Sequence, residues 1–161
     1  MIANLIRHYA KNMSPSFFKI VMNCYPPLLG AGISVLDINS NYTEISVRLK
    51  LTWFNRNYVG TQFGGSLYAM TDPFYMLMFL NNLGNDYIVW DKGARIDFIK
   101  PGKSTVYAKF IITPEILKTV QEKTAAGEKY IFDLPVNIES ESQELIAQVI
   151  KTLYVKKKLR S

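Results

Sequence analysis

Apolar and polar residues alternate over one stretch in the first third of the chain, and this stretch predicts a β-strand. From residue 44 to residue 51, every second side chain is Ile, Val or Leu, and those between are polar or charged. Such a two-residue repeat is typical of a strand with one buried face. An earlier strand is expected over residues 33–38, and the polar run Asn39-Ser40-Asn41 predicts the turn that joins the two.

A different pattern follows between Gly65 and Asn82, where apolar residues occur on every side of a helical projection. A helix without a polar face belongs inside a fold, and Gly84-Asn85 provides its stop. The carboxylate in its middle is Asp72. A buried acid has to be ion-paired, protonated or part of a reaction, because an unpaired buried charge is strongly unfavourable.

Four further strands and one short helix are expected after the central helix. The strands are predicted at residues 94–98, 106–112, 130–138 and 145–155, and the helix opens at Thr113-Pro114-Glu115 and closes at Gly127. The last strand is apolar on both faces, as expected of a strand inside a sheet.

The order of these elements predicts an α+β hotdog fold, in which about six antiparallel strands wrap round one long helix. We expect a helical leader over residues 1–29, the hotdog domain over 30–157 and a basic tail over 158–161. In the leader, Ser14 is the predicted cap of a helix and Pro26-Pro27 its end. A single curled sheet leaves strand edges unpaired, so we expect a homodimer that could pair further into a dimer of dimers.

The composition of the chain excludes several kinds of metal site and catalytic residue. The 161 residues, 48% of them hydrophobic, suffice for one domain with a real core. The single cysteine, Cys24, excludes an internal disulfide and a multi-cysteine metal site, and we expect it in the core of a protein of a reducing compartment. The single histidine, His8, lies outside the predicted core, which argues against a histidine base and against a histidine-rich zinc site. We therefore predict no bound metal.

The formal charge of +6 and the basic run from Lys156 to Arg160 favour anionic partners, although such a run is more often a solvated chain end. No aromatic residues interleave with the lysines, so nucleic-acid binding is not expected. The longest apolar segment, Leu67 to Leu83, is broken by polar residues, and no signal peptide pattern is present. We expect a cytoplasmic protein without stable membrane insertion.

The start of the central helix offers backbone N–H groups and a partial positive charge, and Gly64-Gly65 permits a ligand to approach closely. This favours a carbonyl-like or negative ligand. Asp72 is two turns further along nearly the same side, at ~10 Å for a rise of about 1.5 Å per residue. Gly64 of one chain could more readily meet Asp72 of a two-fold-related chain. The alternative is that Asp72 is a local polar residue beside Pro73, where proline kinks the helix.

Two motifs carry a resemblance to a known family. N-x-x-G-T-x-F-G-G at residues 57–65, with an acid seven positions after the second glycine, resembles the phenylacetyl-CoA-type hotdog acyl-CoA thioesterases, and ARIDFIKPGKSTVYAKF at residues 94–110 is similar to their third and fourth strands. The version with Phe-Gly-Gly and WDKGARIDFIKPG resembles a less characterised bacterial branch. The resemblance covers about residues 30–156.

This resemblance implies hydrolysis of an acyl-CoA or acyl-carrier thioester, with coenzyme A as part of the substrate and no cofactor. Asp72 matches the general base or nucleophile. Gly64 matches the glycine whose N–H polarises the thioester carbonyl, and Asn57 matches an orienting amide. Phe63 departs from the usual histidine, and Met76 departs from a hydroxyl found in some relatives.

Further residues are expected to bind substrate, and the substrate-binding set is Phe63, Gly65, Tyr68, Asp91, Lys100 and Lys103. The lysines flank the Pro101 turn and offer charge to the phosphates of coenzyme A. Asp91 either pairs with Lys92 on the surface or lies at the mouth of the pocket. The two departures, at Phe63 and Met76, favour an alternative in which the protein binds acyl-CoA or fatty acyl groups without catalysis.

Overall fold

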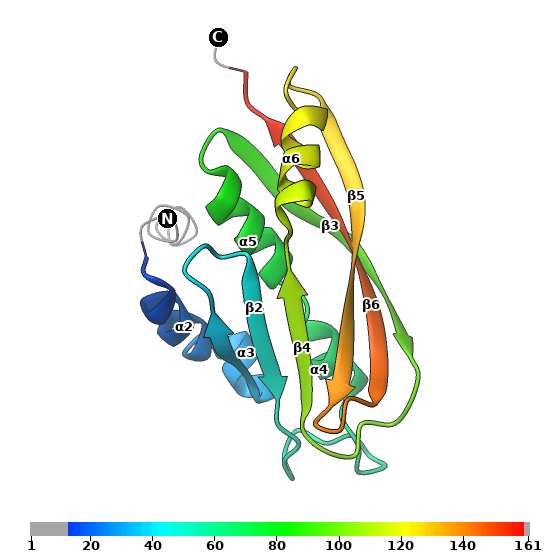
Figure 1. Ribbon diagram of the computed structural model, residues 1–161. Coiled ribbons are helices and arrows are strands. Elements are labelled where there is room, and N and C mark those ends of the chain that lie inside the picture. Colours follow the sequence, from blue (N-terminus) through cyan, green and yellow to red (C-terminus); the bar gives the residue numbers. More distant parts are fainter. Residues whose placement is uncertain (1–12, 160–161) are drawn as a thin grey trace.

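A computed structural model describes residues 13–159 and shows one six-stranded antiparallel sheet (Figure 1). The strands are β1 (Ile33–Ile38), β2 (Glu44–Leu49), β3 (Tyr87–Phe98), β4 (Val106–Ile111), β5 (Lys129–Ser140) and β6 (Leu145–Lys157). Their order across the sheet is β1-β2-β4-β5-β6-β3, and every neighbouring pair is antiparallel. The predicted number and type of strands are confirmed, and β6 lies inside the sheet as its two apolar faces indicated.

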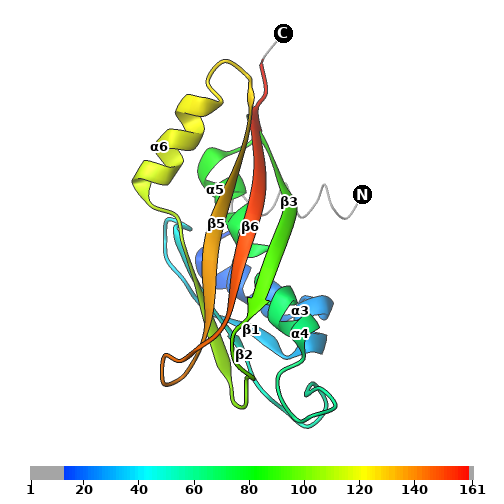
Figure 2. The same cartoon turned by 90° about the vertical axis from the view of Figure 1, so that its right-hand side faces the viewer.

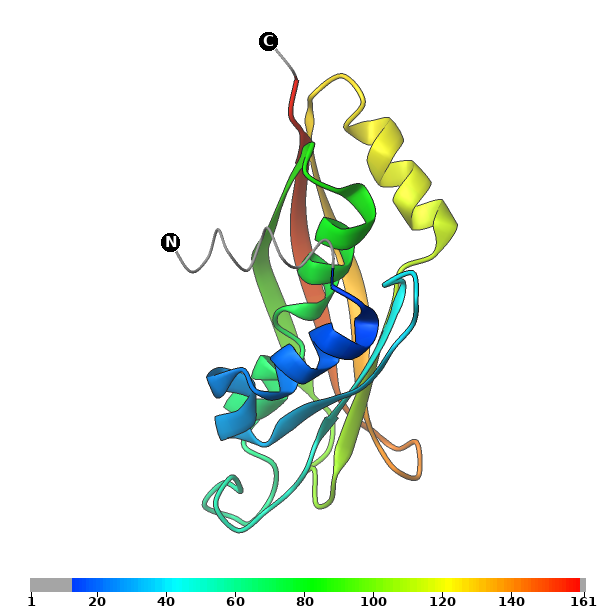
Figure 3. The same ribbon diagram turned by 90° about the vertical axis from the view of Figure 1, so that its left-hand side faces the viewer.

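Helices cover one face of this sheet. They are α2 (Pro15–Asn23), α3 (Pro26–Ala31), α4 (Gly64–Ala69), α5 (Phe74–Leu83) and α6 (Pro114–Lys123). The helices α4 and α5 run along the face, with α2 and α3 beside them near β1 (Figures 1 and 3). Helix α6 lies beside β5, apart from the other helices, and its Val120 belongs to the same core (Figure 2). This is the hotdog arrangement that the order of elements predicted.

The core lies between the helices and the inward-facing residues of the strands. On β2, Ile45, Val47 and Leu49 are fully buried, as their alternation predicted. On α5, Phe74 and Phe79 are fully buried as well, and removing such side chains from water is the main favourable contribution to folding.

The central helix differs from the prediction in one respect, because it is broken. Helix α4 ends at Ala69 and α5 begins at Phe74. Pro73 has no N–H to donate to a helical carbonyl, and the Asp72 amide bonds the Ala69 carbonyl at 3.2 Å instead. The Thr71 hydroxyl donates to the Tyr68 carbonyl at 2.8 Å and closes the end of α4. The expected kink at Pro73 therefore separates two helices and leaves Asp72 in the gap.

The leader also differs in part. Ser14 accepts a hydrogen bond from the Phe17 amide, which confirms it as the helix cap. Pro26-Pro27 opens α3 instead of only ending a segment, because proline suits the first turn of a helix, and Gly32 ends α3 in the left-handed conformation. Cys24 is exposed, so its expected place in the core is wrong. His8 and the rest of the predicted leader before residue 13 lie outside the described residues.

The two edges of the sheet are treated differently. Along the β1 edge, the Asn23 side chain donates to the Val35 carbonyl at 3.1 Å and accepts from its amide at 2.7 Å, and the Lys19 ammonium binds the Leu36 carbonyl. Strand β3 forms the opposite edge and pairs only with β6 among the described residues. Side chains of α2 thus cover the β1 edge. The β3 edge is twelve residues long, and its outer backbone groups have no neighbouring strand among the described residues.

Candidate functional site

Asn57 organises the loop that leads into α4. Its side-chain amide donates to the Thr61 hydroxyl at 2.9 Å and to the Gln62 carbonyl at 3.2 Å. Its side-chain oxygen accepts from the amides of Val59 at 3.1 Å and Thr61 at 3.0 Å. These four bonds use the hydrogen-bonding capacity of the side chain within its own loop. Asn57 therefore fixes the shape of the loop that precedes Gly64.

Gln62 fixes the loop to the end of the sheet, and sequence reasoning missed it. The side chain is buried, and its amide donates to the carbonyls of Leu49 at 3.2 Å and Ser104 at 2.9 Å. Its backbone amide donates to the Gly102 carbonyl at 2.8 Å. Residues 62 and 102 both belong to the motifs quoted above, but a glutamine in a loop gives no pattern that would single it out.

Two aromatic rings lie over the glycines at the start of α4. A β-carbon placed on Gly65 would come within 2.4 Å of the Phe63 ring, and one on Gly64 within 3.0 Å of the Phe98 ring. Both rings are more than half exposed. The glycines thus let Phe63 fold back onto the helix and let the end of β3 pack against it. As first residues of a helix, Gly64 and Gly65 keep amide groups that helical bonding does not use.

Asp72 is not buried in the single chain, which corrects the expectation of an acid enclosed in the core. It lies in the gap between α4 and α5, and its side chain is 58% exposed. One carboxylate oxygen is 3.2 Å from the ammonium of Lys151. The gap made by Pro73 turns this position toward solvent. Of the three fates expected for a buried acid, the structure shows an ion pair.

Lys151 is the second site residue that sequence reasoning missed. It lies on β6 in the inward register of Val149 and Leu153, and its side chain is only 1% exposed. Its ammonium also lies 3.4 Å from a carboxylate oxygen of Asp91 and 5.8 Å from the ring centre of Tyr68. A lysine at an inward-facing strand position is the signal that could have found it, since such a charge needs a partner.

Asp91 points inward to Lys151, so the predicted surface pair with Lys92 is wrong. Its side chain is 19% exposed. Burial raises the pKa of the Asp91 carboxyl from 3.8 to about 6, since desolvation outweighs the attraction of the Lys151 ammonium and the negative charge of Asp72 adds to the rise. Asp72, Asp91 and Tyr68 thus meet at one lysine, and we call these four residues the Lys151 cluster.

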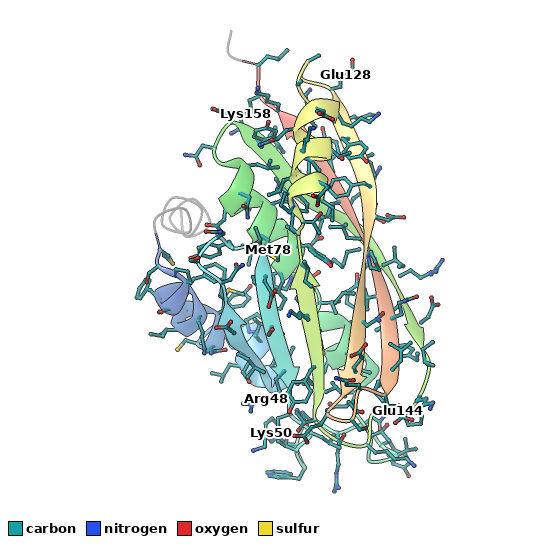
Figure 4. All side chains as sticks on the ribbon, viewed as in Figure 1. Arg48, Lys50, Met78, Glu128, Glu144 and Lys158 are labelled. Carbon is teal, nitrogen blue, oxygen red and sulfur yellow. The ribbon has the colours of Figure 1, made fainter. Side chains whose placement is uncertain are left out.

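The two lysines of the predicted phosphate-binding surface lie elsewhere. Lys100 is exposed and pairs with Glu144 at 2.6 Å. Figure 4 shows Glu144 at the same end of the molecule as Lys50, away from Lys158. Lys103 is exposed on the turn that Gln62 holds. Both lysines thus lie near the loop that leads to Gly64, apart from the Lys151 cluster.

The cavity found in this part of the chain shares only Asp91 with the Lys151 cluster and includes neither of the two lysines. It has a volume of about 570 Å³ and is lined by Ile88, Trp90, Asp91, Lys92, Lys129, Ile131 and Tyr154. Most of these alternate with the inward-facing residues of β3, β5 and β6, so the cavity opens on the outer face of the sheet. Within residues 13–159, no three His, Cys, Asp or Glu side chains are grouped to hold a metal ion. No helix in the same range is long and apolar enough to cross a membrane.

The sequence of this chain matches the model of one protein family. The model of the family described as a domain of unknown function, DUF4442, matches residues 14–155. The match includes β1 to β5, all but the last two residues of β6, and both motifs that carry the resemblance. No curated protein matches the sequence significantly.

Solved structures with the same architecture include three of bacterial origin. A Pseudomonas aeruginosa protein of unknown function, PA5026, named a probable thioesterase, aligns with TM-score 0.80 and 13% identity over 90% of this chain and 97% of its own. A thioesterase candidate from Shewanella oneidensis aligns with TM-score 0.63 and 22% identity over 96% and 99%. The E. coli PaaI protein from the phenylacetic acid degradation operon aligns with TM-score 0.60 and 13% identity over 97% of both chains. These likenesses establish the shared hotdog fold.

Proposed function

Because the chain belongs to the DUF4442 family and has the hotdog fold, we propose that it hydrolyses thioesters of coenzyme A or of an acylated carrier. The observation that carries this proposal is the placement of Asp72. Its carboxylate is open to solvent in one chain, yet the buried Lys151 holds it at the break between two core helices. A fixed and accessible carboxylate is what activation of a water molecule requires.

In the proposed reaction, Asp72 takes a proton from a water molecule as the water oxygen attacks the thioester carbonyl carbon. The amide of Gly64 donates to the carbonyl oxygen and stabilises the negative charge that develops there. The carbon–sulfur bond then breaks, the sulfur leaves as a thiolate, and the proton taken by Asp72 returns to it or to solvent. The products are a carboxylic acid and a thiol.

Gly64 and Asp72 are provided by two chains in this proposal. Gly64 packs against Phe98 at one end of β3, and Asp72 is joined through Lys151 to Asp91, nearer the other end. Antiparallel pairing of two β3 edges places the Asp91 end of one strand opposite the Phe98 end of its partner. The open β3 edge and the covered β1 edge support this mode of dimerisation.

The remaining predicted residues have supporting roles. Asn57 shapes the loop that presents Gly64, as its four hydrogen bonds within that loop indicate. Phe63 and Gly65 form an apolar surface beside Gly64 for the acyl group, and Tyr68 flanks it. Lys100 and Lys103 provide positive charge near the same loop for the phosphates of coenzyme A. No further cofactor is needed for this hydrolysis.

Binding of acyl thioesters without hydrolysis is the second candidate function. The ion pair between Asp72 and Lys151 favours it, because a carboxylate with a partner can serve structure alone. Phe63 and Met76, which lack the polar groups expected at those positions, favour it too. This function predicts tight binding of acyl-CoA with no release of thiol.

Release of free thiol from a panel of short, long and aromatic acyl-CoAs tests the proposal. We expect thiol release by the wild type and a loss of at least ~100-fold in kcat for Asp72→Asn, a size typical of a removed general base. The matched control is Glu122→Gln, which removes an exposed carboxylate of α6 and should leave kcat unchanged. Equal rates for Asp72→Asn and wild type would contradict the mechanism. Binding without release in any variant would indicate the second function.

A further inference from the structure

Lys151 is a charged residue in a place where strands normally carry apolar ones. Along β6, its inward-facing neighbours Val149 and Leu153 are fully buried. Its partners across the ladder are Ala94 on β3 and Leu134 on β5, which are both apolar. Among residues 13–159, Lys151 is the one charged residue that is almost completely buried. The position therefore needs an explanation beyond the packing of the core.

Two carboxylates from different elements face this one ammonium. Asp72 comes from the gap between α4 and α5 and lies at 3.2 Å, and Asp91 comes from β3 and lies at 3.4 Å. The other titratable neighbour is Tyr68 on α4, whose ring centre lies 5.8 Å from the ammonium. The cluster thus joins the helix break to the edge strand through a lysine whose stem is enclosed by the core.

The stability of the folded chain does not explain why position 151 is a lysine. Replacing a buried ion pair by well-packed apolar residues is often neutral or stabilising, because charges lose their hydration on burial. An ion pair that includes an exposed carboxylate contributes little to folding. What the buried ammonium does provide is a fixed point of positive charge beside a carboxylate that would otherwise rotate freely in solvent.

We propose that Lys151 is a positioning residue of the reaction centre, which holds the Asp72 carboxylate at the helix break in one orientation, with Asp91 as the second anchor of the ammonium. This inference rests on the proposed thioester hydrolysis. Lys151 acts through Asp72 and does not touch the substrate. Its loss should affect the chemical step more than substrate binding, because orientation of a base matters most in the transition state.

The test compares Lys151→Met with the wild type in thiol release from pH 5 to 9. Methionine matches the length and flexibility of the lysine stem without the charge. We expect kcat to fall roughly 10- to 100-fold, as for a misplaced catalytic group, with KM changed less than about threefold. Lys109→Met, which removes an exposed strand lysine paired with Glu44, is the matched control and should change neither quantity.

Lys151→Met leaves Asp91 buried without its counter-ion, and the variant could fail to fold for this reason alone. The double variant Lys151→Met/Asp91→Asn removes both buried charges and keeps the test decisive. Carbon NMR of the Asp72 side chain gives a readout that needs no activity. Relaxation of this signal should show a more mobile carboxylate in whichever variant folds than in the wild type.

The outcomes separate this inference from the proposed function. If Asp72→Asn abolishes hydrolysis but the folded Lys151 variants keep the wild-type kcat and the wild-type relaxation of the Asp72 signal, the role of Lys151 is refuted and the proposed function stands. If Asp72→Asn hydrolyses as fast as the wild type, the proposed function falls and this inference falls with it. A reduced kcat with a nearly unchanged KM and a more mobile Asp72 carboxylate supports both.

Discussion

Asp91 is negatively charged at neutral pH although its partial burial disfavours the charged form. Burial raises its pKa to about 6, whereas an unfolded chain exposes it at its ordinary value of 3.8. The folded state therefore binds the proton of Asp91 more tightly than the unfolded state does. The stability that this group contributes is present below about pH 4 and is lost as the pH rises through about 6.

Asp91→Asn should remove this pH dependence. Relative to wild type, the variant should gain about 1–2 kcal/mol in free energy of unfolding between pH 4 and pH 7, which allows for solvent screening of a shift near two pKa units. Urea unfolding at several pH values measures the difference. Asp97→Asn, on the exposed part of β3, is the control and should show no comparable trend. A constant difference between Asp91→Asn and wild type would contradict the raised pKa.

At the scale of elements, the two sheet edges differ in how their backbone groups are used. Asn23 of α2 occupies both the amide and the carbonyl of Val35 on β1. Asn23→Ala should lower the free energy of unfolding by about 1–2 kcal/mol, the loss of two modest hydrogen bonds at a partly solvated edge. Chemical denaturation measures this loss.

The oligomeric state of the same variant tests which edge forms the dimer. Sedimentation should find Asn23→Ala in the same state as the wild type, because β3 and not β1 is proposed as the interface. Asn41→Ala, in the exposed turn after β1, provides the control and should change stability by less than about 0.5 kcal/mol. A change of oligomeric state in Asn23→Ala alone would instead implicate the β1 edge.

Local sequence patterns could predict most of these helices and strands, but not which side chains of different elements come into contact. Alternation located the strands, and Pro73 marked where the central helix breaks. Asp72 and Lys151, however, are 79 residues apart in sequence, and they meet because β6 lies between β5 and β3 under the helix break. That strand order depends on packing of the whole sheet. For this reason the sequence indicated Asp72 and missed the lysine that holds it.

At the scale of the whole molecule, a single chain contains both Gly64 and Asp72, but the Asp72 side chain is more than half exposed to solvent. Two-fold pairing along β3 would bring Gly64 of each chain to the Asp72 of its partner, and would cover part of the exposed surface at Phe63 and Phe98. The two sites of a dimer would then each take one component from each chain. This arrangement can be tested by mixing two inactive variants.

The variants are Asp72→Asn and Gly64→Pro. Gly64 is the first residue of α4, where proline is well accommodated, and Phe63 before it is already extended, so Gly64→Pro removes the amide hydrogen while the helix start is kept. The new ring meets Phe98, whose exposed side chain can move aside. Each variant alone should release thiol at least ~100-fold more slowly than the wild type.

Co-refolding equal amounts of the two variants should restore about one quarter of wild-type activity, because half of the randomly formed dimers are mixed and each mixed dimer holds one intact site out of two. Thiol release before and after co-refolding measures this gain, and refolding each variant by itself is the control. If each site is built within one chain, every site in the mixture contains one defect and no activity returns. Recovery therefore depends on the formation of mixed dimers through β3. In such a dimer, the half-exposed Asp72 of one protomer faces the start of α4 in the other.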